Sequence, residues 1–362
     1  MCDRGNSSLR FFDRYLGIPI VFLLGLFHFK RKKPERFNSV GVLATAAIGD
    51  TLLISPILKD LKKRYPGSDI TIFCGKTNKA TFEMALPSFK LVVIPVNNPL
   101  KSLKIIRSNS FDIFIDFGPW PRLNSILSYF AKSKYRVGFK SINQHRHFVY
   151  DKVVDHLDTN HEIDNLRRVV KEFDVVSESI PSLGDSTPNL ENPYVVVHMF
   201  PSGYKAFYKE WSDYKWVNLI NGLTDNGINV KLTGAPVDVE PCNRIVSSCK
   251  NSSKIEVLAG KTNLKQAGEV LQKSTLVISV NTGIMHMAAA YNKYVIGLHG
   301  PTSPLRWGPI CNNKTDFTAT TKGAGCLHLG FEYVVDDVNS LDSIDESLVL
   351  EEAVRIYKGV LC

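Results

Sequence analysis

The sequence predicts an α/β protein built from two Rossmann-like domains. The first half of the chain opens with a strand over Ser39–Ala44, a helix over Thr51–Tyr65 and a strand over Asp69–Cys74. The second half repeats this strand–helix–strand order between residues 276 and 298. A segment rich in Ser, Pro, Gly and Asn, residues 177–193, lies between the halves and is the clearest domain boundary. We therefore expect each half to form its own sheet.

The length and composition of the chain agree with this division. Its 362 residues are enough for two domains that each bury a hydrophobic core. A hydrophobic content of 44% and a charged content of 22% are typical of a soluble globular protein. The net charge of +9 indicates an anionic partner, which nucleic acid, a membrane or a phosphorylated substrate would satisfy. No nucleic-acid-binding signature is present, so we expect no nucleic-acid partner. The seven cysteines show no zinc-site spacing and fit a reducing cytoplasm.

Residues 1–36 are expected to form a membrane-associating segment. Leu16–Phe29 is almost wholly apolar, but its fourteen residues are fewer than the roughly 20 that a membrane-spanning helix needs. No small-residue cleavage site follows, which argues against a secretory signal. The segment is then either a helix in the plane of the membrane surface or a helix packed on the protein. Flanking basic residues attract anionic lipid and favour the membrane. They are Arg10, Arg14, Lys30, Arg31, Lys32, Lys33 and Arg36.

Residues 37–180 are expected to form the first Rossmann-like domain. Apolar residues in Thr51–Tyr65 recur at the spacing of an amphipathic helix. Further strands are expected over Val92–Pro95 and Asp112–Phe117, with a basic helix over Leu100–Arg107 between them. The domain contains no GxGxxG motif, so the sequence gives only weak support for a dinucleotide site.

Asp50 ends the loop after the first strand, and two roles are open for it. In an ordinary βαβ unit an Asp at this point caps the next helix. A carboxylate at the carboxyl end of a strand also faces the ligand crevice of an open sheet, where a general base would lie. The local pattern by itself favours the helix cap.

Residues 117–150 contain no Asp or Glu and interleave basic with aromatic side chains. One interpretation is a surface that binds an anionic ligand. The other is an aromatic core with a solvated basic face. The basic residues proposed to bind such a ligand are Arg122, Lys132, Arg136 and Lys140.

Residues 190–345 are expected to form the second Rossmann-like domain, and residues 346–362 a closing helix. The first strands are predicted over Tyr194–His198 and Asn229–Thr233. Lys209 follows the loop after the first of them, where its ammonium can meet a phosphate as a point charge. The alternative for a lone lysine is a surface position without a binding role.

The stretch after Leu276–Val280 predicts a site for a phosphorylated ligand. Asn281 or Thr282 can cap the helix that follows, whose free backbone N–H groups attract anions. The next strand, Tyr294–Leu298, ends in a turn-rich loop over residues 299–303. That loop lies at the carboxyl edge of the sheet, where open α/β folds bind ligands. The alternative is an ordinary βαβ unit with surface turns.

Residues 279–309 resemble the donor-site signature of glycosyltransferase family 9, the lipopolysaccharide heptosyltransferases, which runs (S/N)xDTGxMHxAAAxxxPVxxLFGPTxPxxWGP. Asn281 departs from it, because the family has an acidic residue there. The sequence from Lys209 to Trp211 is similar to a (K/R)xW motif whose lysine contacts phosphate in the family. Ile48-Gly49-Asp50 is similar to the family's GAIGD segment, although Ala46 replaces its first glycine. The residues that match the donor-site signature are Gly283, Met285, His286, Ala288–Ala290, Gly300–Thr302, Pro304 and Trp307–Pro309.

The likeness spans about residues 39–310 and implies a GT-B type fold, with two Rossmann-like domains facing across a cleft. It implies an inverting glycosyltransferase that moves a sugar, expected to be heptose, from a nucleotide diphosphate sugar such as ADP-heptose to a lipopolysaccharide-type acceptor. Asp50 would be the catalytic base, and the four basic residues named above would bind this anionic, lipid-linked saccharide. No DxD pair follows a strand, so we expect neither a catalytic metal nor a further cofactor. The donor-binding residues would be Lys209, Glu240, Asn281, Thr282, Gly283, His286, Gly300, Pro301 and Thr302.

This function would place the protein in the cytoplasm, peripheral to the inner face of the cytoplasmic membrane. A nucleotide-sugar epimerase is the alternative with the same fold. A non-catalytic, membrane-associated sugar-nucleotide binder is the alternative from another class, and Asn281 leaves it open. Turnover of a donor separates an enzyme from a binder, and dependence on an acceptor separates a transferase from an epimerase.

Overall fold

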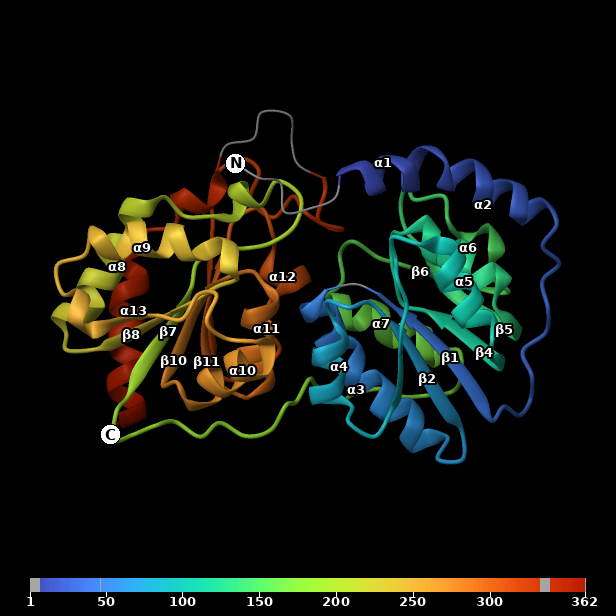
Figure 1. The fold of residues 1–362 in the computed structure, drawn as a ribbon, viewed down its shortest axis with the longest axis horizontal. Helices are drawn as coiled ribbons and strands as arrows, with labels where there is room; N and C mark the ends of the chain where they lie inside the picture. Colours follow the sequence, from blue (N-terminus) through green and yellow to red (C-terminus); the bar gives the residue numbers. More distant parts are fainter. Residues whose placement is uncertain (1–6, 46, 333–338, 362) are drawn as a thin grey trace. The chain divides into compact units, whose positions relative to one another are not determined.

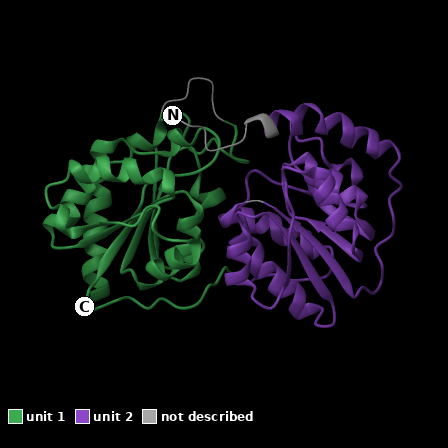
Figure 2. Cartoon of the chain, in the orientation of Figure 1, with its two compact units in different colours: residues 1–5, 180–362 green, residues 6–179 purple. Residues whose placement is uncertain are grey.

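The computed structural model describes residues 7–45, 47–332 and 339–361. The chain divides into two compact units, one ending at Ser179 and the other beginning at Ile180 (Figure 2). This division falls inside the segment that the sequence indicates as the domain boundary. Each unit contains one six-stranded sheet.

The N-terminal unit is a parallel sheet covered by helices, with the strand order β3-β2-β1-β4-β5-β6 (Figure 1). Its strands are β1 (Ser39–Ala44), β2 (Asp69–Cys74), β3 (Lys90–Val93), β4 (Ser110–Asp116), β5 (Lys132–Lys140) and β6 (Lys152–Asp155). Its helices are α1 (Ser7–Tyr15), α2 (Gly17–Leu26), α3 (Ile48–Arg64), α4 (Lys79–Ala85), α5 (Pro99–Arg107), α6 (Arg122–Phe130) and α7 (Glu162–Lys171).

The C-terminal unit is also a parallel sheet, with the order β12-β11-β10-β7-β8-β9 (Figure 1). Its strands are β7 (Tyr194–His198), β8 (Asn229–Thr233), β9 (Ile255–Val257), β10 (Leu276–Val280), β11 (Tyr294–His299) and β12 (Lys314–Thr318). Its helices are α8 (Asp213–Asp225), α9 (Val239–Ser247), α10 (Leu264–Lys273), α11 (Gly283–Ala290), α12 (Pro304–Trp307) and α13 (Glu346–Leu361).

The two sheets have the same topology when each is numbered within its own unit. In both, the third, second and first strands are followed by the fourth, fifth and sixth, which is the Rossmann order. This confirms the predicted fold class of two Rossmann-like domains. The order reverses between β1 and β4 in one unit and between β7 and β10 in the other. The carboxyl ends of those strand pairs are therefore where each unit is expected to bind ligands.

The closing helix α13 is part of the C-terminal unit. Val349, Ala353 and Ile356 are buried in the same apolar cluster as Trp216 and Leu219 of α8. Their spacing of three and four residues places them on one face of the helix. Packing on α8 therefore buries the apolar stripe that the sequence of this helix carries.

The first two helices pack on the N-terminal unit around α6. Val21 is fully buried with Val149 and Tyr150. A Cβ atom added to Gly17 would lie 2.7 Å from Cβ of Arg122, so only glycine allows α2 to approach α6 this closely. The helices of the expected N-terminal segment thus belong to the same compact unit as the first sheet. Within the residues described, no helix is both long enough and apolar enough to cross a membrane.

Candidate functional site

Asn281, Thr282 and Gly283 lie at the carboxyl end of β10, where the strand order of the C-terminal sheet reverses. Thr282 is the N-cap of α11, and its Oγ1 accepts a hydrogen bond from the backbone N–H of Met285 at 3.5 Å. The predicted capped helix start is therefore correct, with Thr282 as the cap. The first N–H groups of α11 have no partner within the helix, so the helix start can bind an anion.

The loop after β11 lies beside this helix start on the neighbouring strand. Pro301 O accepts a hydrogen bond from Leu327 N at 2.8 Å, and Thr302 pairs with Leu327 in a β-bridge. A Cβ atom on Gly300 would lie 3.0 Å from the backbone nitrogen of Leu341, which explains the glycine. Thr302 Oγ1 is buried and has no hydrogen-bond partner among the described residues. A buried hydroxyl of this kind is available for a ligand oxygen.

Lys209 lies at the end of a short 3-10 helix, Ala206–Lys209, in the loop after β7. Its Nζ donates to the carbonyl of Ser202 at 3.1 Å. The loop is anchored by Trp211 and Trp216, whose buried rings meet edge to face at 4.9 Å between centroids. Because β7 and β10 are the strands at which the order reverses, this loop and the start of α11 follow neighbouring strands.

Two other predicted donor residues lie on nearby helices. His286 is buried in α11, one turn after the cap. Glu240 lies in the first turn of α9, which follows β8, and its side chain is 78% exposed. It forms an ion pair with Arg244 at 3.2 Å. The structure places both residues after carboxyl ends of the sheet, but it brings only His286 into the helix that forms the anion site.

Asn281 takes part in a polar series that the sequence did not reveal. Its Nδ2 donates to the Trp307 carbonyl at 2.8 Å and lies 3.3 Å from His299 Nδ1. His299 Nε2 lies 2.8 Å from Asp316 Oδ1. The only sequence signal was His299 itself, which stands where the family signature has phenylalanine.

Asp50 is the third residue of α3 and lies at the switch point of the N-terminal sheet, just after β1. The expectation that it ends a loop is wrong, because the helix begins at Ile48 rather than Thr51. The N-cap is Ala47, which makes no side-chain capping bond, so Asp50 is not the cap residue. Asp50 is half-buried in the first helical turn, where the helix dipole stabilises a carboxylate. Ala46, where the family has glycine, lies outside the described residues.

A buried network supports the loop before α3. Thr45 Oγ1 lies 3.4 Å from Asn124 Oδ1, and Asn124 Nδ2 donates to Asp116 Oδ1 at 3.3 Å. Asp116 forms a fully buried ion pair with Arg146, and Tyr150 donates to the same carboxylate at 2.6 Å. These contacts connect the carboxyl ends of β1 and β4. They hold Thr45, the residue that directly follows β1.

The four basic residues proposed to bind an anionic acceptor do not form one surface. Arg122 is buried, donates to Gln144 O and forms an ion pair with Asp13 at 3.3 Å. Arg136 is buried as well and donates to the carbonyls of Ser128 and Ala131. Both arginines stabilise the N-terminal unit from inside, so neither an anion-binding surface nor a solvated basic face describes them.

The two lysines of that set are exposed but lie at opposite ends of β5. Lys132 begins the strand and Lys140 ends it, so about 26 Å of extended chain separates them at roughly 3.3 Å per residue. Only Lys140 lies at the carboxyl edge of the sheet, the edge to which Asp50 also belongs. Of the four basic residues, Lys140 is therefore the candidate for binding an anionic acceptor at this edge.

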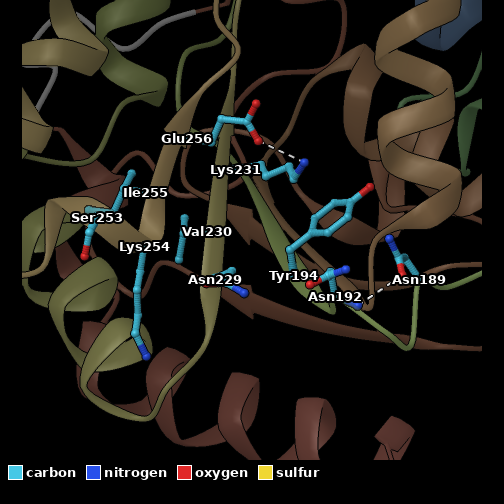
Figure 3. Close-up of a pocket in the computed structure, with 10 residues that line it drawn as sticks. All are labelled: Asn189, Asn192, Tyr194, Asn229, Val230, Lys231, Ser253, Lys254, Ile255 and Glu256. Carbon is cyan, nitrogen blue, oxygen red and sulfur yellow. Dashed lines mark hydrogen bonds and ion pairs between the residues drawn. The ribbon is translucent and has the colours of Figure 1, made fainter.

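A separate hollow of about 250 Å³ lies on the C-terminal unit (Figure 3). It is lined from the beginnings of β7, β8 and β9, for instance by Tyr194, Asn229 and Ile255. This is the amino edge of the sheet, opposite the edge of the predicted donor site. In Figure 3 the Lys231 ammonium pairs with Glu256 at 2.9 Å beside the hollow, so these charges already neutralise each other.

The described residues include no group of three or more His, Cys, Asp or Glu side chains arranged to hold a metal ion. The polar groups at the predicted donor site are backbone N–H groups, hydroxyls, the amide of Asn281 and the ammonium of Lys209. Such donors suit an anionic ligand with several oxygen atoms.

Comparison with known proteins identifies the family of the chain. The profile of glycosyltransferase family 9 (heptosyltransferase) matches residues 100–330. The lipopolysaccharide core heptosyltransferase OpsX of Haemophilus influenzae is 25% identical over 297 residues, which cover 77% of this chain and 83% of that protein.

Two solved structures share the fold. ADP-heptose lipopolysaccharide heptosyltransferase II of E. coli has a TM-score of 0.71 and 20% identity, covering 89% of this chain and 99% of that one. The E. coli heptosyltransferase WaaC with ADP has a TM-score of 0.70 and 18% identity, covering 88% of this chain and 99% of that one. Since the family profile matches well over half of its residues, the chain belongs to glycosyltransferase family 9, the heptosyltransferases.

Proposed function

We propose that this protein is an inverting glycosyltransferase that transfers heptose from ADP-heptose to a lipopolysaccharide core or a related lipid-linked saccharide. One observation carries the proposal. This chain belongs to the family and has a capped helix start, Thr282–Gly283, at the switch point of its second sheet. The buried Thr302 hydroxyl, which has no partner among the described residues, lies in the loop after the neighbouring strand. The names of OpsX and of heptosyltransferase II support the choice of heptose and of an ADP-linked donor.

The donor diphosphate is proposed to bind without a metal ion. The first N–H groups of α11 and the hydroxyl of Thr302 would donate to its oxygens, and Lys209 would supply a positive charge. Gly300 and Pro301 hold the backbone from which Thr302 projects. Glu240, on the helix after β8, is proposed to contact the nucleoside. These groups stabilise the charge that develops on the leaving diphosphate, which is the main requirement of the transfer.

Asp50 is proposed to remove the proton from the acceptor hydroxyl. An inverting displacement needs a base on the face of the sugar opposite the departing diphosphate. A carboxylate in the first turn of α3, at the switch point of the other sheet, is suited to this role. Lys140, at the same edge of that sheet, is proposed to contact an anionic group of the acceptor.

The protein is further proposed to act at the inner face of the cytoplasmic membrane, where a lipid-linked acceptor is found. The helices α1 and α2 bury one side on the protein and expose aromatic and aliphatic side chains on the other, for example Phe22, Leu23 and Leu26 at 51%, 55% and 63%. Exposed Lys30 and Lys32 follow directly. An apolar face beside a basic segment complements the interface of an anionic bilayer.

The test is a transfer assay with the full-length protein. ADP-heptose is incubated with and without a heptose-deficient lipopolysaccharide acceptor, in buffer with and without EDTA, and both ADP and the glycosylated lipid are measured by mass spectrometry. We expect acceptor-dependent release of ADP, unchanged by EDTA, with inversion at the anomeric carbon. Isomerisation of the donor without acceptor would instead identify an epimerase, and binding without turnover would identify a sugar-nucleotide binder.

A further inference from the structure

The hydrogen-bond series from Trp307 to Asp316 has only one consistent arrangement of protons. The carbonyl oxygen of Trp307 can only accept, so the Asn281 atom 2.8 Å from it must be the amide nitrogen. The same nitrogen lies 3.3 Å from His299 Nδ1, which must then be the acceptor of its second proton. The imidazole is therefore neutral and carries its proton on Nε2, where it donates to Asp316 Oδ1 at 2.8 Å.

In this arrangement only the amide oxygen of Asn281 is available to a ligand. Both of its N–H groups are used inside the protein, and its Oδ1 takes no hydrogen bond from the described residues. The side chain is only partly buried and directly precedes the helix cap Thr282. We infer that Asn281 is a specificity residue whose Oδ1 accepts a hydrogen bond from a hydroxyl of the donor's sugar, and that its amide donates none to the sugar. His299 and Asp316 are positioning residues that hold the amide in this orientation. The inference rests on the proposed function, because it assumes that this edge binds a nucleotide sugar.

The inference explains why two departures from the family signature occur together. An aspartate at position 281 would point a carboxylate at the Trp307 carbonyl and at the lone pair of His299 Nδ1, and both contacts would repel it. A phenylalanine at position 299 removes the acceptor that the asparagine uses. Asn281 with His299 therefore forms a matched pair, and the family's acid with phenylalanine would form another.

Gly297 provides the space that the pair requires. Its position in β11 is two residues before His299, so both lie on the same side of the strand. A Cβ atom at this position would lie 2.7 Å from Asp316 Oδ1 and 2.8 Å from His299 Nε2. Any larger residue would separate the two groups whose hydrogen bond fixes the imidazole tautomer.

The test is a double-mutant cycle with Asn281→Asp, His299→Phe and the double variant, with Asn312→Asp as a control of the same chemical change at an exposed position. The dissociation constants of ADP-heptose and of ADP are measured by calorimetry for each protein, and their ratio reports contacts to the sugar. We expect each single substitution to shift this ratio about 3- to 10-fold against ADP-heptose, as the loss of one hydrogen bond does. The double variant should return to within about threefold of wild type, and the control should not change. Additive effects of the two substitutions, or an unchanged ratio in Asn281→Asp, would overturn the inference.

A second measurement needs no ligand. In protein labelled with ¹⁵N-histidine, the signals of His299 are assigned by their absence from His299→Phe. We expect the neutral tautomer with the proton on Nε2 at pH 7.5, and a proton on Nδ1 would overturn the inference. If wild type binds neither ADP nor ADP-heptose, the proposed function fails. The NMR result then still decides whether the amide is held as inferred, so the two failures are distinguishable.

Discussion

At the scale of single residues, the predicted donor site contains polar groups that the protein leaves incompletely bonded. Thr302 Oγ1 has no partner among the described residues although it is buried, and the first N–H groups of α11 have none within their helix. An unsatisfied buried polar group destabilises the folded protein by roughly 1–3 kcal/mol. A ligand with several anionic oxygens would satisfy all of these groups at once. This is why we assign the diphosphate, rather than the sugar, to the edge formed by Thr282 and Thr302.

Lys209→Ala is expected to weaken ADP binding by about 1.5–3 kcal/mol, or roughly 10- to 150-fold, because a hydrogen bond to a charged group is lost. Calorimetric titration with ADP measures this directly. Lys265→Ala, a lysine exposed on α10, is the matched control and should bind as wild type does. Equal affinity in all three proteins would remove Lys209 from the donor site.

Asp50→Asn should slow the chemical step by about 10²- to 10⁴-fold, the usual contribution of a positioned base. The amide keeps the size of the side chain but cannot take the acceptor proton. Single-turnover kinetics with saturating donor report this step, and donor affinity should stay near that of wild type.

Asp69→Asn is the control for Asp50→Asn, because this exposed residue begins β2 at the opposite edge of the same sheet. It should transfer heptose at the wild-type rate. Since Asp50 is not the N-cap, its substitution should change the melting temperature only slightly, by the loss of a helix-dipole interaction worth about 0.3–1 kcal/mol. A large drop in melting temperature with normal turnover would contradict the catalytic role.

At the scale of elements, α1 and α2 pack on the N-terminal unit with one side and expose apolar side chains on the other. Gly17 and Val21 face the protein, where Val21 is fully buried. Asp13 pairs with the buried Arg122, and Arg31 pairs with Asp151 at 2.6 Å. The opposite side exposes large apolar residues such as Leu23 and Leu26, while Phe22 is half exposed and packs edge to face on Phe148. The pair is thus a structural part of the N-terminal unit as well as the candidate membrane surface.

Replacing Phe22, Leu23 and Leu26 together with serine should reduce sedimentation with anionic phospholipid vesicles by tenfold or more, since each removes exposed apolar area from the proposed interface. The melting temperature should stay near that of wild type. Vesicles of neutral phosphatidylcholine are the lipid control and should bind less of either protein. Unchanged sedimentation of the triple variant would contradict the membrane surface.

Deleting residues 7–26 tests the structural role of the same helices. The deletion removes Val21 from its apolar cluster and leaves Arg122, a buried cation, without its carboxylate partner Asp13. Loss of one partner of a buried ion pair destabilises a protein by roughly 3–5 kcal/mol. Calorimetry should therefore show a lower melting temperature than for the triple serine variant. An unchanged melting temperature would mean that the helices are a removable anchor.

At the scale of the whole molecule, two sheets of the same strand order carry different parts of the proposed reaction, and the segment between them is held to the protein. Within the C-terminal unit, residues of this segment bond to α10 and α11, as Thr187 does through Gln272 O and Leu183 through Ala290 O. Lys293 contributes as well, because its buried Nζ donates to Ser186 Oγ at 2.6 Å. Burial lowers the pKa of Lys293 from 10.5 to about 8.

The pKa of Lys293 predicts a change of stability with pH. Between about pH 8 and 10.5 the unfolded chain holds the proton more tightly than the folded protein does, so stability contributed by this residue rises with pH in that window. Urea unfolding of wild type and Lys293→Met should diverge in favour of wild type by up to about 3 kcal/mol from pH 8 to 10.5. The pair of wild type and Lys265→Met, an exposed lysine, should not diverge. Parallel stability curves for Lys293→Met would refute the shift.

Several features follow from the sequence because they depend on neighbouring residues only. Strands at Ser39–Ala44, Asp69–Cys74 and Leu276–Val280 were predicted to the residue, since each is a short apolar run bounded by polar or turn-forming residues. The capped start of α11 was predicted because Asn and Thr are preferred N-cap residues and here directly follow such a strand. The family motif rests on the same local pattern.

Other features were decided by contacts between residues far apart in the chain. Residues 117–150 include α6 and β5, and two of their arginines are buried. Arg122 pairs with Asp13, which lies 109 residues away in the sequence, and Arg136 donates to the carbonyl of Ala131. His299 gains its partner because β12 places Asp316 opposite Gly297, from where its carboxylate lies within hydrogen-bond distance of His299 Nε2. Asn281 in turn takes its orientation from the carbonyl of Trp307. No local pattern encodes these pairings, since burial and partner choice depend on which strands lie side by side. The sequence alone therefore predicts which residues form the candidate site, and the tertiary structure decides the direction in which their side chains point.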